Sequence, residues 1–183
     1  MSDEHASKIA EVAAFWREAG PEKWFKKDEA FDIIFRKTFL DEHFAAARRE
    51  YEEWVESPEG ALALMILLDQ FPRNCFRNTG HMYATDELAR YYANRALEKG
   101  HDLSVAEELR AFFYLPFMHS EDVDDQRRCV ELCSHGSPAN VEYANDHYDI
   151  VQRFGRFPHR NIILGRDTTE EERAFLDEGG FAG

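Results

Sequence analysis

The sequence is poor in the features that mark several protein classes. Basic residues are scarce, since 22 Lys and Arg stand against 36 Asp and Glu and give a formal net charge of −14. Phosphate binding needs clustered cations, so we expect neither nucleic acid nor an anionic membrane surface as a partner. No apolar run reaches the roughly 20 residues of a transmembrane helix, and the first residues do not form a secretory signal. We therefore expect a cytoplasmic protein.

Cysteine is also scarce, with three residues in the chain, so we expect reduced thiols and no disulfide framework. Cys129 and Cys133, with His135 nearby, lack the spacing of a zinc site and are expected to face the core. The acidic run 121–125 beside His119 lacks the glycine and spacing of a calcium loop, and is typical of a helix start instead. Phosphate-binding glycine loops and nucleophile elbows are absent as well. We expect no metal and no cofactor.

Hydrophobic residues recur at helical spacing, and no segment shows sustained two-residue alternation. The pattern predicts an all-α protein with helices packed in antiparallel pairs and a single domain over residues 1–183, whose ends at 1–4 and 180–183 are loose. Every face from Ala61 to Leu68 is apolar, so this helix must be covered on all sides and is expected at the centre of the core. Pro72 is expected to end it.

Serine or threonine followed by proline or by an early carboxylate is typical of a helix start. Such residues are Ser57, Thr85, Ser104, Ser120, Ser137, and Thr168 or Thr169 followed by Glu171 or Glu172. Earlier helices are predicted over 4–19, 28–40 and 41–56. Predicted helix ends are Gly100, Pro116, Gly136 and Gly179.

Two segments carry Arg and His without a carboxylate, in a chain that is otherwise acidic. The first basic segment is Phe71–His81, and the second basic segment is Arg153–Asn161. They are similar to each other, since Phe71-Pro-Arg-Asn74 in one matches Phe157-Pro-His-Arg-Asn161 in the other apart from one inserted histidine. An arginine offers a planar fork of donors that suits carboxylate or phosphate.

These segments suggest a module that binds an acidic small molecule or a peptide carboxylate in an Arg/His/Asn cleft. We expect Arg73 and Arg160 to converge on that cleft. The candidate ligand-binding residues are Asp69, Gln70, Arg73, Asn74, Arg77, Arg153, Arg156, His159, Arg160 and Asn161.

Three alternatives explain the same residues. In the first, Arg73 and Arg160 pair with Asp69, Asp149 or helix carbonyls and form a purely structural network. In the second, the protein is an enzyme in which His119 or His159 acts as general acid or base on an anionic substrate. In the third, exposed aromatic residues such as Trp24 or Phe181 mediate self-association of a scaffold. The oligomeric state is open.

Motifs along most of the chain resemble one bacterial family. They are Leu67–Asn74, Ala84–Asp86, Arg110–Glu121, Arg153–Asn161 and Thr169–Leu176. Together they are similar to the bacterial domain of unknown function 924 (DUF924) family. The resemblance implies an all-helical domain in which helix pairs form a tetratricopeptide-like right-handed superhelix, and it implies no activity. The residues that fall inside the family's motifs are Asp69, Gln70, Arg73, Asn74, Arg77, His119, Glu121, Arg156, His159, Arg160 and Asn161.

Overall fold

The structure, a computed structural model, describes residues 2–134 and 138–181. The predicted helix start Ser137, the predicted end Gly136 and His135 lie outside these ranges. None of the described residues lies in a strand, which confirms the all-α prediction. The chain divides into two compact units, which we describe separately: unit 1 holds residues 1–77 and 81–116, and unit 2 holds residues 78–80 and 117–183. The single domain and the tetratricopeptide-like superhelix stay predictions.

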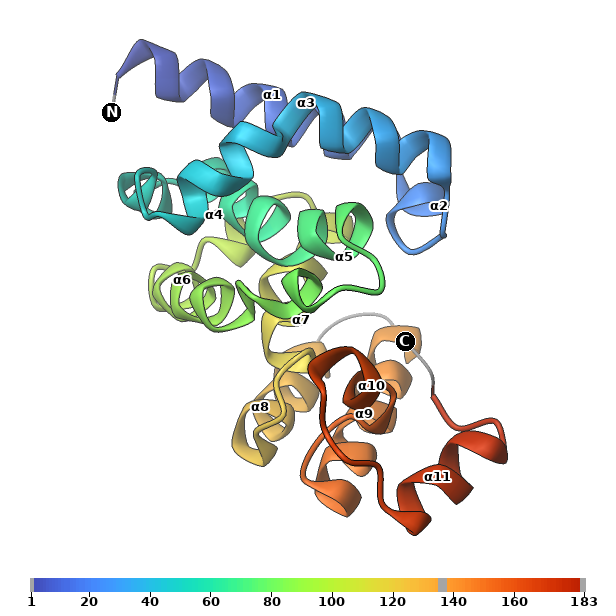
Figure 1. Ribbon diagram of the computed structural model, residues 1–183. Helices are drawn as coiled ribbons and strands as arrows, with labels where there is room; N and C mark the ends of the chain where they lie inside the picture. Colours follow the sequence, from blue (N-terminus) through green and yellow to red (C-terminus); the bar gives the residue numbers. More distant parts are fainter. Residues whose placement is uncertain (1, 135–137, 182–183) are drawn as a thin grey trace. The chain divides into compact units, whose positions relative to one another are not determined.

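Unit 1 contains the first seven α-helices, joined by short 3₁₀ segments (Figure 1). The helices are α1 (Asp3–Ala19), α2 (Pro21–Trp24), α3 (Glu29–Ala47), α4 (Pro58–Met65), α5 (Phe71–Cys75), α6 (Asp86–Glu98) and α7 (Ala111–Met118), the last of which runs across the boundary into unit 2. A π-helix, Ile66–Gln70, joins α4 to α5, and 3₁₀ helices lie at Glu52–Glu56, Gly80–Tyr83, Asp102–Ser104 and Glu107–Leu109.

The apolar run 61–68 lies at the centre of unit 1, as predicted. All eight of its residues are fully buried, and α4 packs against α1, α6 and the 3₁₀ helix before it. Ser57 caps α4 by accepting the Gly60 N–H at 3.2 Å, with Pro58 in the first turn. Gly60 is required here because a Cβ at this position would clash with the Trp54 carbonyl oxygen. Burial on every side is what an all-apolar helix needs.

The helices predicted over 28–40 and 41–56 are instead one helix, α3, followed by a 3₁₀ turn. The α3 backbone bends at Phe39, where φ is −124° and ψ is 18°, so the pattern placed a boundary at a kink. The helix continues to Ala47, and Arg49 with φ of +64° then turns the chain into Glu52–Glu56. A left-handed residue after the last turn is a common way to end a helix.

Some of the other predicted helix starts and ends are confirmed, and others are wrong. Gly100 has φ of +68° after α6, as predicted. The capping box of α11 is formed by Thr169 and Glu172, one of the alternatives predicted for this start. The start at Ser104 is wrong, because 3₁₀ turns occupy that stretch and α7 begins at Ala111. Pro116 lies inside α7 and does not end it.

Unit 2 contains α8 (Val123–Cys133), α9 (Pro138–Phe154), a 3₁₀ helix Pro158–Arg160, α10 (Asn161–Leu164) and α11 (Glu170–Asp177). Its core includes Ile150, Val151 and Phe157, with α8 packed against α9 and α11 packed against Pro158–Arg160. The cap of α8 is Asp122, which accepts the N–H groups of Asp124 and Asp125, and not Ser120 as predicted. None of the helices in the described part of the chain combines the length and apolarity needed to cross a membrane.

Candidate functional site

Pro72, in the first basic segment, lies inside a helical run. The π-helix 66–70 leads straight into α5, so the prediction that Pro72 ends the helix is wrong. Proline has no N–H. The Leu68 carbonyl therefore lacks the α-helical donor four residues later, which would be the N–H of residue 72. The Leu67 carbonyl lacks the same N–H, which lies five residues later and would be its donor in a π turn. Both leucines are fully buried. Their carbonyl groups therefore need donors from elsewhere in the chain.

Two side chains supply those donors. Thr85 Oγ1 donates to the Leu68 carbonyl at 2.6 Å, and the Nδ1 atom of His43, on α3, lies 2.8 Å from the Leu67 carbonyl. Thr85 precedes α6 at the predicted cap position, but its hydroxyl caps no N–H of that helix. Because Pro72 has no N–H, the π turn is hydrogen-bonded to His43 on α3 and to Thr85 at the start of α6.

His43 also pairs with His81, the last residue of the first basic segment. Their Nε2 atoms lie 2.8 Å apart, a hydrogen-bond distance. A carbonyl only accepts, so His43 carries its hydrogen on Nδ1 when it bonds Leu67, and its Nε2 accepts from the Nε2–H of His81. Burial lowers the pKa of His43 to about 4, so the ring is neutral near pH 7. Burial, and then the charge of Arg36, lower the pKa of His81.

Arg73 is held by two carboxylates. It donates to both oxygens of Asp86 at 2.8 and 3.0 Å and lies 3.1 Å from an oxygen of Asp69, which is fully buried and also accepts from Gln70 at 2.6 Å. Burial alone would lower the pKa of Arg73, but Asp69 and Asp86 raise it above the usual range. The pairing with Asp69 is the one that the structural-network alternative predicted.

A partly buried carboxylate holds further residues of the first basic segment. Asp32, on α3, accepts from the Asn74 amide at 2.8 Å and from Arg77 Nε at 2.8 Å. The Cys75 thiol lies beside it, and burial raises the pKa of this thiol to about 12, which leaves it protonated and unreactive. Asp69, Gln70, Arg73, Asn74 and Arg77 therefore all belong to hydrogen-bonded clusters inside unit 1.

The second basic segment is likewise bound to acidic residues of its own unit. Arg156 donates to both oxygens of Glu172 at 2.6 and 2.9 Å, and the buried Asn161 amide donates to Glu172 at 3.1 Å. The hydrogen bonds from Arg156 hold the pKa of Glu172 at about 2, against the effect of burial. Arg153 forms an exposed pair with Glu171 at 2.9 Å.

The remaining candidates of unit 2 lie around Phe157. The Arg160 guanidinium stacks over the Phe157 ring at 4.4 Å, and the His159 ring contacts the same ring at 5.7 Å. Burial, followed by the charge of Arg160, lowers the pKa of His159 to about 4. His119 is partly buried. The catalytic roles of His119 and His159, and the meeting of Arg73 in unit 1 with Arg160 in unit 2, stay predictions.

Several partners had no signal in the sequence. Asp32 and Arg166 are examples. Asp32 lies on an amphipathic helix, where a carboxylate is ordinary. Arg166 lies in a loop and forms a two-point pair with Glu121, and Glu121 also accepts the Phe157 N–H at 2.8 Å. Asp86 could have been noticed, because it lies within the motif Ala84–Asp86. Each of these pairs joins residues 13 to 45 positions apart, which no local spacing rule detects.

The described residues contain no group of three His, Cys, Asp or Glu side chains that could hold a metal ion. Cys129 and Cys133 are buried free thiols with their sulfur atoms 3.9 Å apart, as expected of core cysteines. Trp24 is 6% exposed and its Nε1 donates to the Trp16 carbonyl at 2.7 Å. It is therefore not an exposed aromatic residue for self-association, whereas Phe181 is 37% exposed.

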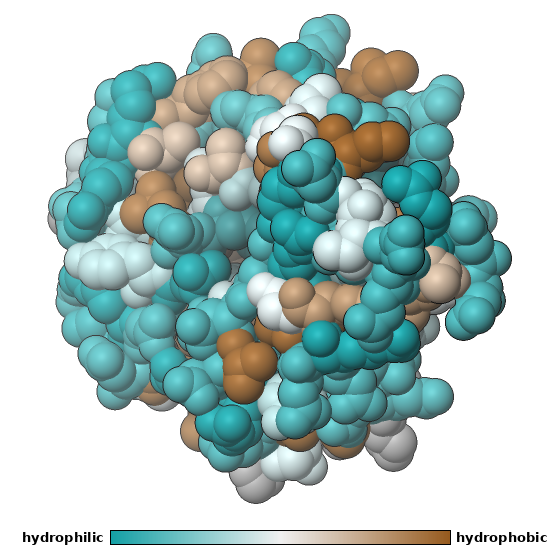
Figure 2. Space-filling model, turned by 60° about the horizontal axis from the view of Figure 1, so that its bottom comes forward, coloured by the Kyte–Doolittle hydropathy of each residue, from teal (hydrophilic) through white to brown (hydrophobic). Residues whose placement is uncertain are grey.

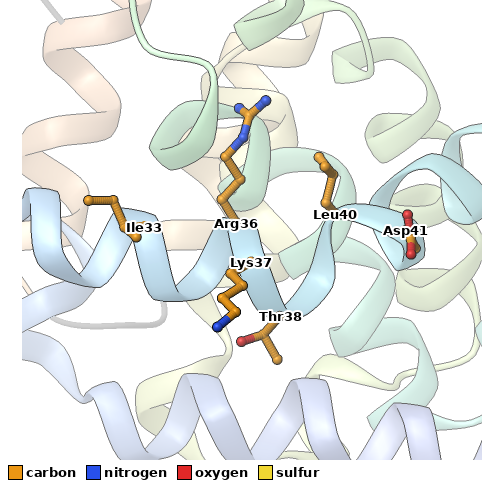
Figure 3. Close-up of a pocket in the computed structure, with 6 residues that line it drawn as sticks. All are labelled: Ile33, Arg36, Lys37, Thr38, Leu40 and Asp41. Carbon is orange, nitrogen blue, oxygen red and sulfur yellow. The ribbon is translucent and has the colours of Figure 1, made fainter.

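A depression of about 390 Å³ lies on the outer surface of α3 (Figure 3). It is lined by Ile33, Arg36, Lys37, Thr38, Leu40 and Asp41. Figure 3 shows all six side chains on this helix, with Arg36 extending to the same side as Leu40. Two of the lining residues, Ile33 and Leu40, are apolar, and Ile33 is 67% exposed. On the face drawn in Figure 2, by comparison, apolar residues form separate groups among hydrophilic ones.

Arg36 connects this depression to the first basic segment. Its Nη1 donates to the Cys75 carbonyl at 2.6 Å, and its guanidinium lies 4.5 Å from the centre of the Phe76 ring. The His81 ring lies 4.1 Å from the same phenyl ring. Arg36 is thus an exposed guanidinium held in place by a backbone oxygen and a ring, unlike Arg73, which two carboxylates neutralise.

Comparison with known proteins agrees with the resemblance in the sequence. Residues 12–180 match the model of the family described as "Bacterial protein of unknown function (DUF924)". A solved structure, of the protein of unknown function ATU0120 from Agrobacterium tumefaciens, is 57% identical, covers 95% of this chain and 99% of that one, and superimposes with a TM-score of 0.94. No curated protein gives a match.

Proposed function

The chain belongs to the DUF924 family of bacterial proteins, and from the geometry of its own residues we propose that unit 1 is a binding module for a small carboxylate-bearing molecule. The proposed site is the depression on the surface of α3 that Arg36 and Lys37 help to line. Arg36 carries the proposal, because it is exposed, positioned and not neutralised by a carboxylate. Most arginines of the two basic segments are engaged by acidic residues, and a ligand contact by them would have to displace those partners.

The charge and the shape of this surface favour a small acid. Arg36 and Lys37 bring two positive charges to the depression, and Asp41 brings one negative charge. The Cys75 carbonyl uses one of the five N–H groups of the Arg36 guanidinium, and the others can bind a carboxylate in the two-point manner of arginine. Because the site is open to water, we expect weak binding, with a dissociation constant of about 1 mM.

Titration of ¹⁵N-labelled protein with acetate and succinate at constant ionic strength tests this proposal. We expect saturable shifts of the backbone amides of residues 33–41 and of Phe76. Arg36→Ala should weaken binding by about 10-fold or more, because it removes a two-point contact made of charge-assisted hydrogen bonds. Lys26→Ala is the matched control, since Lys26 is an exposed cation outside the depression.

Two results would refute the proposal. One is a wild-type protein whose amides in 33–41 do not respond to either acid. The other is an equal loss in Arg36→Ala and Lys26→Ala, which would mean general attraction of anions and no localised site.

A further inference from the structure

Resting on the function proposed above, we propose that His81 supplies a hydrogen-bond acceptor that makes this site select hydroxy acids over the corresponding acids without a hydroxyl group. The ligand would present its carboxylate to Arg36 and its hydroxyl to the Nδ1 atom of His81. Both protein groups lie against the ring of Phe76, at 4.5 and 4.1 Å from its centre.

The order of hydrogen bonds determines which nitrogen of His81 accepts. The Leu67 carbonyl needs a donor, so His43 has its hydrogen on Nδ1 and presents a bare Nε2. His81 therefore donates from its own Nε2, 2.8 Å away. A neutral imidazole carries one hydrogen, which leaves the Nδ1 atom of His81 as an acceptor. This order originates in the π turn and in Pro72, because the Phe71 N–H donates to the Ile66 carbonyl and Pro72 has no N–H, which leaves His43 to serve the Leu67 carbonyl.

The Nδ1 atom of His81 is available to a ligand. Among the described residues it makes no hydrogen bond, and it is not a buried atom. The surroundings keep the ring neutral: α3 contributes the charge of Arg36 and the neutral His43, and Phe44 and Phe76 cover the ring with uncharged surface. A neutral acceptor and a fixed cation that contact the same phenyl ring are complementary to a ligand that carries both a hydroxyl group and a carboxylate.

Paired acids that differ by one hydroxyl group test this inference. Malate and succinate form one pair, and lactate and propionate form another. In the wild type we expect each hydroxy acid to bind about 2- to 10-fold more tightly than its partner, the effect of one hydrogen bond. His81→Phe should bind both members of a pair equally, whereas Arg36→Ala should weaken both by the same factor and keep their ratio.

The possible failures are distinguishable. If neither malate nor succinate moves the amides of 33–41, the proposed function fails and this inference fails with it. If both acids bind the wild type equally, or if His81→Phe keeps the preference, this inference alone is overturned. A measurement that needs no variant is the long-range ¹⁵N spectrum of the imidazole rings, in which we expect the hydrogen of His81 on Nε2. A hydrogen on Nδ1 would also overturn the inference.

Discussion

The hydrogen bond from Thr85 to the Leu68 carbonyl predicts that the effects of Thr85→Val and Pro72→Ala on stability depend on each other. Thr85→Val replaces the hydroxyl with a methyl group of the same size, so it removes the 2.6 Å bond and leaves a buried carbonyl without this donor. We expect a loss of about 1–3 kcal/mol in the free energy of unfolding. Pro72→Ala supplies another donor for the Leu68 carbonyl, because an alanine at position 72 has a backbone N–H four residues after Leu68.

The two substitutions should therefore not be additive. In the Pro72→Ala background the backbone N–H can satisfy the Leu68 carbonyl, and Thr85→Val should cost at least about 1 kcal/mol less there than in the wild type. The double-mutant cycle removes the other effects of losing a proline, such as the greater freedom of the unfolded chain. Thr38→Val is a matched control. Its hydroxyl also donates to a helix carbonyl, that of Ile34, at 2.8 Å, but on an exposed turn that contains no proline.

Urea unfolding followed by tryptophan fluorescence measures these energies. The three tryptophans of the chain, Trp16, Trp24 and Trp54, all lie in unit 1, so the signal reports the unit that carries the substitutions. For Thr38→Val we expect a change within about 0.5 kcal/mol. A coupling energy between Pro72→Ala and Thr85→Val below about 0.5 kcal/mol would refute the assignment of Thr85 as the replacement donor.

Three further predictions use buried charges and pH. Arg73→Ala leaves Asp69 and Asp86 without their guanidinium, and it should lower the free energy of unfolding by about 3–5 kcal/mol in the same fluorescence assay. Arg17→Ala breaks an exposed pair and should lower it by less than about 1 kcal/mol. Equal losses in the two variants would contradict the role of Arg73. The pKa of His43 is about 4 in the folded chain against an ordinary 6.5, so the unfolded chain binds the extra proton and stability should fall as the pH drops from 6.5 to 4. His43→Gln should fall less over that window, and identical curves would rule His43 out. The pKa of Glu172 is about 2 against 4.5, so its stabilisation is present above pH 4.5 and is lost as the pH falls towards 2. Thermal unfolding by circular dichroism should show a smaller loss over this range in Glu172→Gln than in the wild type. Some loss should remain, because Glu121, whose pKa is lowered against the effect of burial by the hydrogen bond from Arg166, is protonated there too. Equal losses in the two proteins would contradict the assignment.

Local rules predicted much of the fold. Ser57 with Pro58, and Thr169 with Glu172, are starts that a few neighbouring residues determine, and both are found where expected. The buried run 61–68 was also visible, because an uninterrupted apolar helix has no solvent-facing side. The boundary near Asp41 failed because a kink at Phe39 resembles a break in the periodic pattern.

The candidate site was less predictable, because it depends on pairs distant in sequence. Arg73 and Arg77 were identified as important, but their partners Asp86 and Asp32 could not be assigned from spacing. Arg36 gave no signal at all, since an exposed arginine on an amphipathic helix is ordinary. What distinguishes it is its contact with Cys75 and Phe76, 39 and 40 positions later, which only folding brings about.

The π-helix between α4 and α5 has a consequence for the length of the chain. A π turn is equivalent to one additional residue in an α-helix, and one residue corresponds to a rotation of about 100° around the helix axis. Deleting one residue from Ile66–Gln70 would let the run close into a regular α-helix, and the residues that follow would keep nearly their present direction, because the π turn already absorbs that rotation. A further inserted residue would instead turn Arg73 away from Asp86, so this segment should tolerate the loss of one residue better than the gain of one.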